Sequence, residues 1–305
     1  MRYIGVDIGG TKCAVVYGDE NGNILKKEKF DTNNPKDDIA KIIELAKLMG
    51  EAEAVGISCG GPLDEEKGII MSPPNLPGWD DVHITEMIEK ELGIPAYLCN
   101  DANACAIAEW QFGAGRGSRH MAFLTFGTGL GAGLILDGKL YSGAKGMAGE
   151  VGHIRLSDFG PVGYGKKGSF EGFCSGGGIA QLAEMMVKEK QQMGIEVPWA
   201  NEKITAKTVA DAANSGDELA KEVYSICGEQ LGKGLSILID ILALEKIVIG
   251  SVFQRSENLI RPSMERVIKK EVLSQNMSCE IVPAELGDNI GDYAALAVAK
   301  TRKEQ

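Results

Sequence analysis

Two glycine-rich turns are the parts of this sequence that best fit a chemical role. In Asp7-Ile-Gly9-Gly10-Thr11-Lys12, the glycines follow a short apolar strand, and a second strand comes directly after them. Because glycine has no Cβ, the backbone N–H groups of such a turn can approach an anion closely. Thr11 adds a hydroxyl donor, Lys12 adds a charge, and Asp7 could hold Mg²⁺ through water. The turn predicts phosphate binding, with a plain tight hairpin as the alternative.

A second glycine turn, at 127–129, follows the apolar segment 121–126. Each turn is followed by a strand and then by a hairpin signal, Asn-Gly at 21–22 and Asp-Gly at 137–138. We interpret this pattern as an internal duplication of an α/β unit, with both turns facing a shared cleft. Neither turn has the spacing of a Walker or dinucleotide-binding loop, which would precede a helix. Gly250 ends a third apolar strand and is a weaker candidate.

Polar side chains that could bind a polyol or accept a proton lie at strand ends and in loops. Asp101 follows the apolar segment 95–99, and a carboxylate at such a strand end can reach a ligand. With an ordinary pKa near 3.9 it is ionised at neutral pH, so it could accept the proton of a hydroxyl that attacks phosphorus. Taken alone, its position directly before a helix favours the role of N-cap instead. Carboxylates, amides and imidazole bind polyols, and the candidates are Asn75, Asn100, Glu150, His153 and Glu171, with Gly61 and Trp79 in nearby loops.

The elements that must position these residues alternate between strands and helices. Apolar periodicity predicts helices at 37–49 and 222–244, and Ala-rich segments predict two more at 102–111 and 291–300. Segment 113–118 is typical of a linker. We therefore expect an α/β domain at 1–118, completed by the C-terminal helix at 290–305, and a larger α/β domain at 119–289. The remaining expected elements are strands at 3–8, 13–17, 54–59, 95–99, 121–126, 133–136 and 247–249, a strand from 24 onward, and a helix at 84–92.

Composition excludes several classes of protein. The chain has 305 residues, of which 44% are hydrophobic and 25% charged, as in a globular protein of about two domains. A net charge of −11 disfavours nucleic acid or an anionic membrane as the main partner. We find no apolar run long enough for a membrane span and no signal-peptide pattern. The seven cysteines contain no Cys-x-x-Cys pair, so we expect reduced thiols in the cytoplasm.

Six motifs, in this order, are similar to those of the ROK (repressor, open reading frame, kinase) family. The resemblance covers nearly the whole chain. It implies the α/β, two-domain fold of the actin, hexokinase and Hsp70 ATPases, built from duplicated RNase H-like domains with an interdomain cleft. The motifs are Asp7-Ile-Gly-Gly-Thr-Lys12, Gly60-Gly-Pro-Leu-Asp64, Pro74-Asn-Leu-Pro-Gly-Trp79, Asn100-Asp-Ala-Asn-Ala104, Thr125-Phe-Gly-Thr-Gly-Leu-Gly131 and Gly149-Glu-Val-Gly-His153.

The resemblance also implies a cytoplasmic sugar kinase that uses ATP and Mg²⁺ in carbohydrate metabolism and is usually a homodimer. We expect it to phosphorylate glucose or a close relative at the 6-OH, with Asp101 as the catalytic base. By the same resemblance, Gly61, Asn75, Asn100, Asp101, Glu150, His153 and Glu171 would bind the sugar. The nucleotide would face Asp7, Gly9, Gly10, Thr11, Lys12, Gly127, Thr128, Gly129 and, at the nucleoside, Gly250.

One departure from the family concerns zinc. The family usually carries Cys-x-Cys-Gly-x-x-Gly-Cys-x-Glu, whose three cysteines bind structural zinc together with a histidine. The matching segment keeps its glycines and Glu171 but has Val162, Tyr164 and Ser169 at the cysteine positions. His153 alone is far short of the usual four ligands. We therefore expect no zinc, and we expect His153 to need another partner.

Other substrates and roles stay open. The acceptor could be N-acetylmannosamine, N-acetylglucosamine, allose or fructose, and polyphosphate could be the donor. The family also contains sugar-sensing repressors, but the first expected strand begins at residue 3, which leaves no room for an N-terminal helix-turn-helix. The acidic charge further disfavours DNA. A sugar-binding protein without catalysis is less consistent with the presence of Asp101 and both glycine turns.

Overall fold

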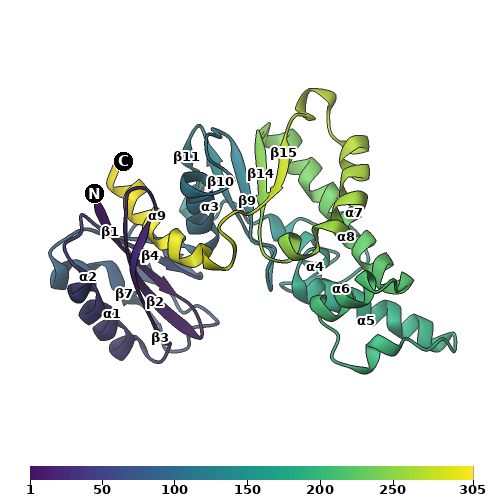
Figure 1. Cartoon of the computed structure of the whole chain (residues 1–305), viewed down its shortest axis with the longest axis horizontal. Coiled ribbons are helices and arrows are strands. Elements are labelled where there is room, and N and C mark those ends of the chain that lie inside the picture. The colour runs from purple at the N-terminus through teal and green to yellow at the C-terminus, as the bar shows by residue number, and fades with distance from the viewer. Residues whose placement is uncertain (305) are drawn as a thin grey trace. The chain divides into compact units, whose positions relative to one another are not determined.

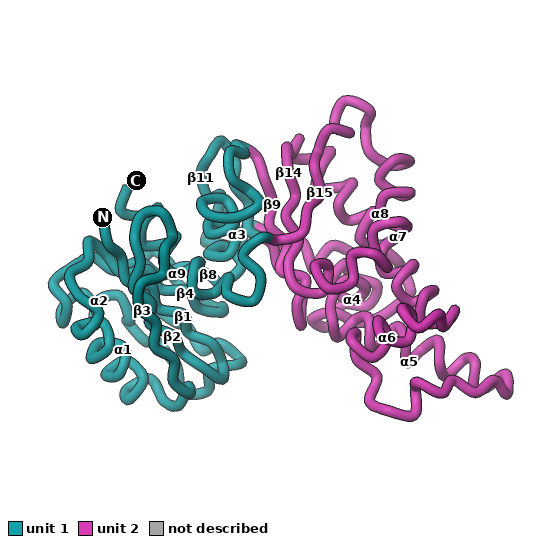
Figure 2. Tube along the Cα trace, in the orientation of Figure 1, with its two compact units in different colours: residues 1–119, 133–148, 285–305 teal, residues 120–132, 149–284 magenta. Residues whose placement is uncertain are grey.

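The computed structural model describes residues 1–304, which form two compact units (Figures 1 and 2). Unit 1 contains residues 1–119, 133–148 and the chain from 285 onward, and unit 2 contains residues 120–132 and 149–284. The C-terminal helix thus belongs to unit 1 with the N-terminal residues. Unit 1 also includes 133–148, a segment that the sequence assigned to the second domain.

Unit 1 is built on a five-stranded sheet with the order β3-β2-β1-β4-β8. Strands β1, β2 and β3 form an antiparallel meander, while β4 and β8 run parallel to β1. The carboxyl ends of β1, β4 and β8 therefore share one edge, where ligands bind in open α/β sheets. The strands are β1 (Arg2–Ile8), β2 (Lys12–Asp19), β3 (Ile24–Asp31), β4 (Val55–Cys59) and β8 (Ala96–Asn100).

Alternating side chains of this sheet pack on two different faces. Ile4, Val6 and Ile8 belong to the core with α1 (Pro35–Met49) and α2 (Ile84–Leu92). On the other face, Tyr3 and Val16 pack against α9 (Ile290–Glu304), which also contacts α3 (Asp101–Phe112). Smaller elements of unit 1 are β5 (Leu63–Asp64), β6 (Ile69–Ile70), β7 (Val82–His83), β11 (Lys139–Leu140) and the 3-10 turns at Ala144–Gly146 and Gly287–Asn289. Strand β10 (Ala132–Leu136) also belongs to unit 1, except for its first residue.

Helix α9, yellow in Figure 1, lies unusually close to the sheet because glycine and alanine meet at the contact. A Cβ at Gly56 would lie 2.1 Å from the backbone oxygen of Ala295, and one at Gly5 would lie 2.9 Å from the backbone nitrogen of Leu296. Ala295 and Leu296 are themselves buried. The Ala-rich segment that predicted this helix is therefore also the reason that it can approach β1 and β4 so closely.

Unit 2 has three parallel strands, with β14 (Lys246–Ile249) between β9 (Met121–Leu124) and β15 (Glu280–Pro283). The long helix predicted from 222 begins earlier, at Glu218, because the Asp217 carboxylate caps it by accepting from the Ala220 N–H at 2.8 Å. The helices are α4 (Phe170–Phe173), α5 (Gly176–Gln192), α6 (Ala206–Asn214), α7 (Glu218–Leu242) and α8 (Val252–Glu271). A hairpin of β12 (Val162–Gly163) and β13 (Lys166–Lys167) and 3-10 turns at Val151–His153, Pro198–Asn201 and Ser274–Asn276 complete the unit.

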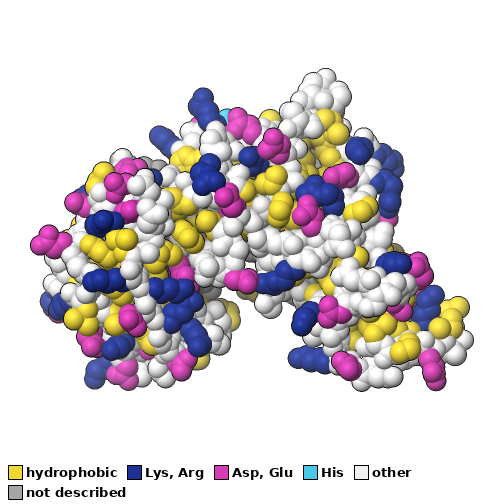
Figure 3. Space-filling view, in the orientation of Figure 1, with side chains coloured by type: hydrophobic (Ala, Val, Ile, Leu, Met, Phe, Trp, Pro, Cys, Tyr) yellow, Lys and Arg dark blue, Asp and Glu magenta, His cyan; other side chains and the backbone are white. Residues whose placement is uncertain are grey.

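Charged side chains of both signs cover the surface of each unit. On the face in Figure 3, Lys and Arg side chains lie beside Asp and Glu side chains. Exposed ion pairs such as Lys47–Glu91, at 2.8 Å, contribute little to stability in water. Within residues 1–304, no helix has the length and apolar character needed to cross a membrane. The cysteines of this part of the chain are all free thiols.

We predict that Gly56→Ala destabilises unit 1. The new methyl group would overlap the Ala295 carbonyl, so α9 must shift away from β4, at a cost of about 1–3 kcal/mol or more in the free energy of unfolding. Urea denaturation measures this cost. Gly60→Ala is the matched control, because a Cβ there would lie 3.7 Å or more from its neighbours. Equal stability of the Gly56 and Gly60 variants would contradict the close packing described here.

Candidate active site

The first glycine turn, Asn75 and Asp101 come together at the edge of unit 1 where β1, β4 and β8 end. A Cβ at Gly10 would lie 2.6 Å from the backbone oxygen of Asn75, so only glycine fits against this loop. A Cβ at Gly60 would lie 3.7 Å from both polar atoms of the Asn75 amide and 3.8 Å from Oδ2 of Asp101. The amide and the carboxylate therefore flank one small space beside Gly60.

Asp101 is the first residue of α3, and the cap of that helix is the residue before it. The side chain of Asn100 accepts a hydrogen bond from the Ala102 N–H at 3.0 Å. Oδ1 of Asp101 accepts from the same N–H at 2.8 Å. The cap predicted for Asp101 thus belongs mainly to Asn100, because Asn100 is the residue with extended backbone. The Nδ2 of Asn100 lies 3.6 Å from the Cβ position of Gly61, so three predicted sugar residues share this edge with Gly61.

The environment of Asp101 makes its carboxylate more basic. Its side chain is accessible to solvent, but the protein atoms around it displace enough bulk water to raise its pKa. The hydrogen bond from the Ala102 backbone lowers the pKa and offsets part of this effect. A carboxylate with a raised pKa is a better general base than an ordinary aspartate.

Glu65 holds the end of β8, although the sequence analysis assigned it no role. Its Oε1 accepts a hydrogen bond from the backbone N–H of Asn100 at 2.9 Å, and its Oε2 pairs with Arg302 of α9 at 3.2 Å. The Glu65 side chain is only 13% exposed. The pair connects the loop after β4, the C-terminal helix and the strand end that presents Asp101.

Glu109 holds the other end of α3. Its buried carboxylate accepts hydrogen bonds from three backbone N–H groups, those of Ala114 at 2.8 Å, Glu285 at 3.2 Å and Leu286 at 2.9 Å. These N–H groups belong to two segments, one at Ala114 and one at 285–286. The chain passes from one unit to the other shortly after the first segment, at 119–120, and directly before the second, at 284–285. A glutamate within a buried Ala-rich helix could have indicated this role from the sequence, since buried carboxylates require partners.

Asp7, at the end of β1, is half-buried among other carboxylates. Burial raises its pKa from the ordinary 3.8 to about 6, and the nearby charges of Asp292 and Asp101 add to the increase. Lys29 and a hydrogen bond with Ser58 lower the pKa but do not cancel these effects. The edge therefore concentrates negative charge, which a cation would neutralise.

This arrangement fits a magnesium ion. A Cβ at Gly291 would lie 2.5 Å from Oδ2 of Asp7, so the start of α9 touches that carboxylate. Neighbouring Asp292 is buried and already paired with Lys27. Mg²⁺ takes one or two carboxylates and keeps several waters, so Asp7 is the residue of this set that would hold it.

The remaining residues of the first turn form a tight hairpin. The Gly9 N–H donates to the Lys12 carbonyl at 3.0 Å, and the Thr11 carbonyl accepts from the Thr32 N–H at 3.0 Å. The Lys12 ammonium is exposed and lies 3.8 Å from the carboxylate of Asp31. The hairpin expected as the alternative is therefore present, and a phosphate contact by these residues stays a prediction.

The second glycine turn, in unit 2, lies against the start of α5. The Gly127 N–H donates to Gly129 at 2.9 Å, and the Gly127 carbonyl accepts from the Gly176 N–H at 2.8 Å. A Cβ at Gly177 would lie 3.6 Å from the Thr128 carbonyl. Helix N-termini favour anions, so segment 175–178 joins the candidate phosphate residues. Its sequence signal, a capping serine followed by three glycines, was missed.

Gly250 follows β14 beside this turn. Its N–H donates to the Leu124 carbonyl at 2.9 Å, and the next residue, Ser251, has its Oγ 3.9 Å from the Cβ position of Gly127. Ser251 has a φ of +53°, which is uncommon for a residue with a side chain. Gly250 and Gly127 therefore follow neighbouring strands of unit 2, and a role of Gly250 at a ligand stays a prediction.

Glu171, Glu150 and His153 lie close together in unit 2. Oε2 of Glu171 accepts from the Leu130 N–H at 2.9 Å, and a Cβ at Gly129 would lie 2.7 Å from it. The His153 N–H donates to the Glu150 carbonyl at 3.2 Å, and both side chains are exposed. A Cβ at Gly152 would lie 3.2 Å from the Cβ of Glu171, so the Glu171 side chain contacts both the second glycine turn and the segment that carries the other two residues.

The residues at the family's zinc positions do not fit zinc. Within residues 1–304, no group of three or more His, Cys, Asp or Glu side chains could hold a metal ion. Ser169 is buried and caps α4, with its Oγ accepting from the Gly172 N–H at 3.0 Å. Val162 and Tyr164 are exposed on the β12–β13 hairpin. Hydrogen bonds and side-chain packing therefore occupy this segment.

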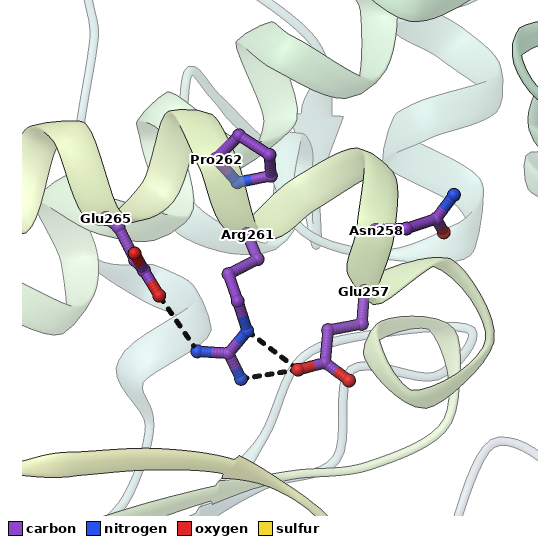
Figure 4. Close-up of a pocket in the computed structure, with 5 residues that line it drawn as sticks. All are labelled: Glu257, Asn258, Arg261, Pro262 and Glu265. Atoms are coloured by element: carbon purple, nitrogen blue, oxygen red, sulfur yellow. Dashed lines mark hydrogen bonds and ion pairs between the residues drawn. The ribbon is translucent and has the colours of Figure 1, made fainter.

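Figure 4 shows a pocket on α8 whose lining includes none of the predicted site residues. At its centre, Arg261 is bound by Glu257 at 2.7 Å and by Glu265 at 3.2 Å. Its guanidinium also donates to the Ile281 carbonyl at 3.0 Å. Because these partners satisfy the guanidinium, Arg261 is not free to bind an anionic ligand in this pocket.

Comparisons with known proteins identify similar chains and folds. The protein-family model described as "ROK family" matches residues 3–302 of the sequence. The glucokinase of Thermotoga maritima is 34% identical over 311 aligned residues, which cover 99% of this chain and 98% of that protein. The solved ROK hexokinase of Thermus thermophilus has a TM-score of 0.85 at 26% identity, covering 100% of this chain and 99% of that one. A Streptomyces griseus ROK glucokinase in complex with glucose and AMPPNP has a TM-score of 0.76 at 30% identity, covering 99% and 100%.

We predict that Asp7→Asn stabilises the chain in a pH-dependent way. The pKa of Asp7 is about 6 in the folded chain and 3.8 ordinarily. Folding therefore favours the protonated side chain. The stability that this provides is fully present below pH 3.8 and is lost as the pH rises through about 6. At pH 8 the variant should therefore gain up to about 3 kcal/mol in the free energy of unfolding. The gain should shrink as pH falls towards 5.

Urea denaturation of wild type and variant at pH 5 and pH 8 measures this difference. Asp31→Asn serves as the control, because that carboxylate side chain is 82% exposed and should show no such change. A gain of the same size at both pH values would mean that charge burial at Asp7 is not its cause.

Proposed function

The chain belongs to the ROK family, and from this premise we propose that it transfers the γ-phosphoryl group of ATP to the 6-OH of glucose or a close relative. The glucokinases among its relatives support the coarser assignment, a sugar kinase. The glucose and AMPPNP bound to one of them support this choice of acceptor and donor. The observation that carries the proposal is the carboxylate of Asp101, which faces the space beside Gly60 and the Asn75 amide.

Asp101 would act as the general base. Its Oδ1 is engaged with the Ala102 N–H, which leaves Oδ2 to accept the proton of the attacking hydroxyl. As the O–H bond breaks, the sugar oxygen forms its bond to phosphorus and ADP leaves. The raised pKa of Asp101 favours this proton transfer. The amides of Asn75 and Asn100 would orient the sugar, since each offers a donor and an acceptor to neighbouring hydroxyls.

The residues of unit 2 would bind other hydroxyls of the sugar. Glu171 uses Oε2 for the Leu130 N–H, so its Oε1 is the oxygen left to accept from a hydroxyl. Glu150 supplies a second carboxylate and His153 an imidazole, both accessible to solvent. Polyol recognition depends on such fixed acceptors, because a substrate that lacks the matching hydroxyl leaves them unpaired.

The glycine turns would bind the phosphates. In unit 1 the turn at 9–10 offers backbone close to Asn75, and in unit 2 the turn at 127–129 is joined by the start of α5. Magnesium, held by Asp7 through water, would neutralise charge on the phosphates when bound. Thr11 and Lys12 would add a hydroxyl and a charge, and Gly250 would lie at the nucleoside.

N-acetylhexosamines, allose and fructose are the alternative acceptors, polyphosphate is an alternative donor, and a sugar sensor without catalysis is the less favoured role. These acceptors differ in stereochemistry or by an acetamido group, so the unpaired polar groups of the site would decide among them. The homodimer and the cytoplasmic location stay predictions that rest on the family resemblance.

We predict that Asp101→Asn abolishes most sugar-dependent ADP release. A positioned base contributes about 10²–10⁴-fold, so the variant should lose about 3–5 kcal/mol of barrier lowering. A coupled ADP-release assay with Mg-ATP, run over a panel of hexoses and N-acetylhexosamines, measures turnover and identifies the acceptor.

Asp81→Asn, at a carboxylate side chain that is 83% exposed in the same unit, should keep wild-type turnover. The Asp101 variant should still melt at a higher temperature when the sugar is present, which shows folding and binding. Near-wild-type turnover in a folded Asp101→Asn chain would reject Asp101 as the base. No turnover on any sugar, with sugar still raising the melting temperature, would favour a sensor.

A further inference from the structure

His153 has partners of its own where zinc would hold a histidine in the family. We propose that Tyr164 and Lys166 position the His153 imidazole for binding a sugar hydroxyl, without a metal. This inference rests on the proposed function, because it concerns one of the sugar-binding residues named there. It assigns roles to two residues of the segment that has lost the cysteines.

Tyr164 contacts the His153 ring directly. The two ring centroids lie 5.2 Å apart with an interplanar angle of 76°, an edge-to-face arrangement that aromatic pairs favour. Tyr164 and Gly165 form the two-residue turn between β12 and β13, and both have positive φ, +43° and +74°. Asn and Gly usually occupy such turns, so a tyrosine at this position is unusual. A tyrosine held at positive φ is consistent with a role for its ring.

Lys166 holds the backbone of the same residue. Its ammonium donates to the His153 carbonyl at 2.6 Å. The two segments are further joined by backbone hydrogen bonds, from Phe170 to Ile154 at 2.7 Å and from Leu156 to Gly168 at 2.9 Å. The backbone and the ring of His153 are therefore restrained from the same hairpin, one by a charged hydrogen bond and the other by an aromatic contact.

This mode of support has a chemical consequence. A zinc ion would occupy one imidazole nitrogen, whereas the hydrogen bond from Lys166 goes to the His153 backbone and leaves the ring nitrogens unoccupied. Within residues 1–304, neither ring nitrogen of His153 takes part in a hydrogen bond. A neutral imidazole has one donor and one acceptor nitrogen. Either nitrogen of His153 is therefore available to a sugar hydroxyl, whereas a metal-bound histidine has only one nitrogen left for this purpose.

The chain contains only three histidines, so NMR of ¹⁵N-histidine-labelled protein tests the contact. His83 and His120 serve as internal references, and His153→Gln assigns the third set of signals. We expect Tyr164→Ala to shift the His153 ring signals and leave the other two in place. Tyr164→Phe keeps the aromatic edge, so its His153 signals should stay near those of the wild type.

Kinetics of the same variants tests the functional consequence. We expect Tyr164→Ala and Lys166→Met each to raise KM for the sugar about two- to tenfold, the size expected for one aromatic or charged contact. The kcat should change less than twofold, because Asp101 is untouched, and Lys166→Arg should restore KM. Lys167→Met is the matched control, since its ammonium lies over the Phe159 ring instead.

Each outcome decides something. Unmoved His153 signals in Tyr164→Ala, or an unchanged KM, would overturn the inference. So would a shift of these signals after dialysis of the wild type against a chelator with Mg²⁺ then restored, because a bound metal would then be the partner. If glucose and the other sugars neither move the His153 signals nor support turnover, the proposed function fails. The Tyr164→Ala signals still report the contact in that case.

Discussion

The close approach of α9 to β1 and β4 is the constraint on which the site in unit 1 depends. Gly5 and Gly56 leave no Cβ between the sheet and Ala295, so the helix backbone rests almost on the strands. At its start, α9 places Gly291 against the Asp7 carboxylate. Near its end, Arg302 pairs with the Glu65 that holds the Asn100 backbone. A single helix thus supports both strand ends that present the candidate carboxylates, Asp7 and Asp101.

The carboxylates of the candidate site lower the stability of the folded chain when they are charged. Asp7 and Asp101 both lie where burial raises the pKa of a carboxylate, and the charges of Asp292 and Asp101 raise the pKa of Asp7 further. Folding alone would favour neutral side chains at these positions. A bound cation and a proton-releasing substrate would relieve this charge, so the unfavourable electrostatics are consistent with a site for Mg-ATP and an alcohol.

Local patterns predicted most of the elements and part of the site. Apolar strands that end in glycine predicted β1, β4 and β9 with their turns, because these signals lie within a few residues of one another. The capping assignment at Asp101 was wrong by one residue, since Asn100 carries the extended backbone. Glu65 and Glu109 were missed because their partners, Arg302 and Leu286, are far away in the sequence.

The central claim is that phosphorus moves from ATP to a sugar oxygen. ³¹P NMR of the wild-type chain with Mg-ATP and the sugar that gives the highest turnover follows this transfer directly. The account predicts a phosphomonoester signal that grows as the γ-phosphate signal of ATP declines, with little inorganic phosphate. Growth of inorganic phosphate alone would show hydrolysis without transfer, and that result would contradict the account.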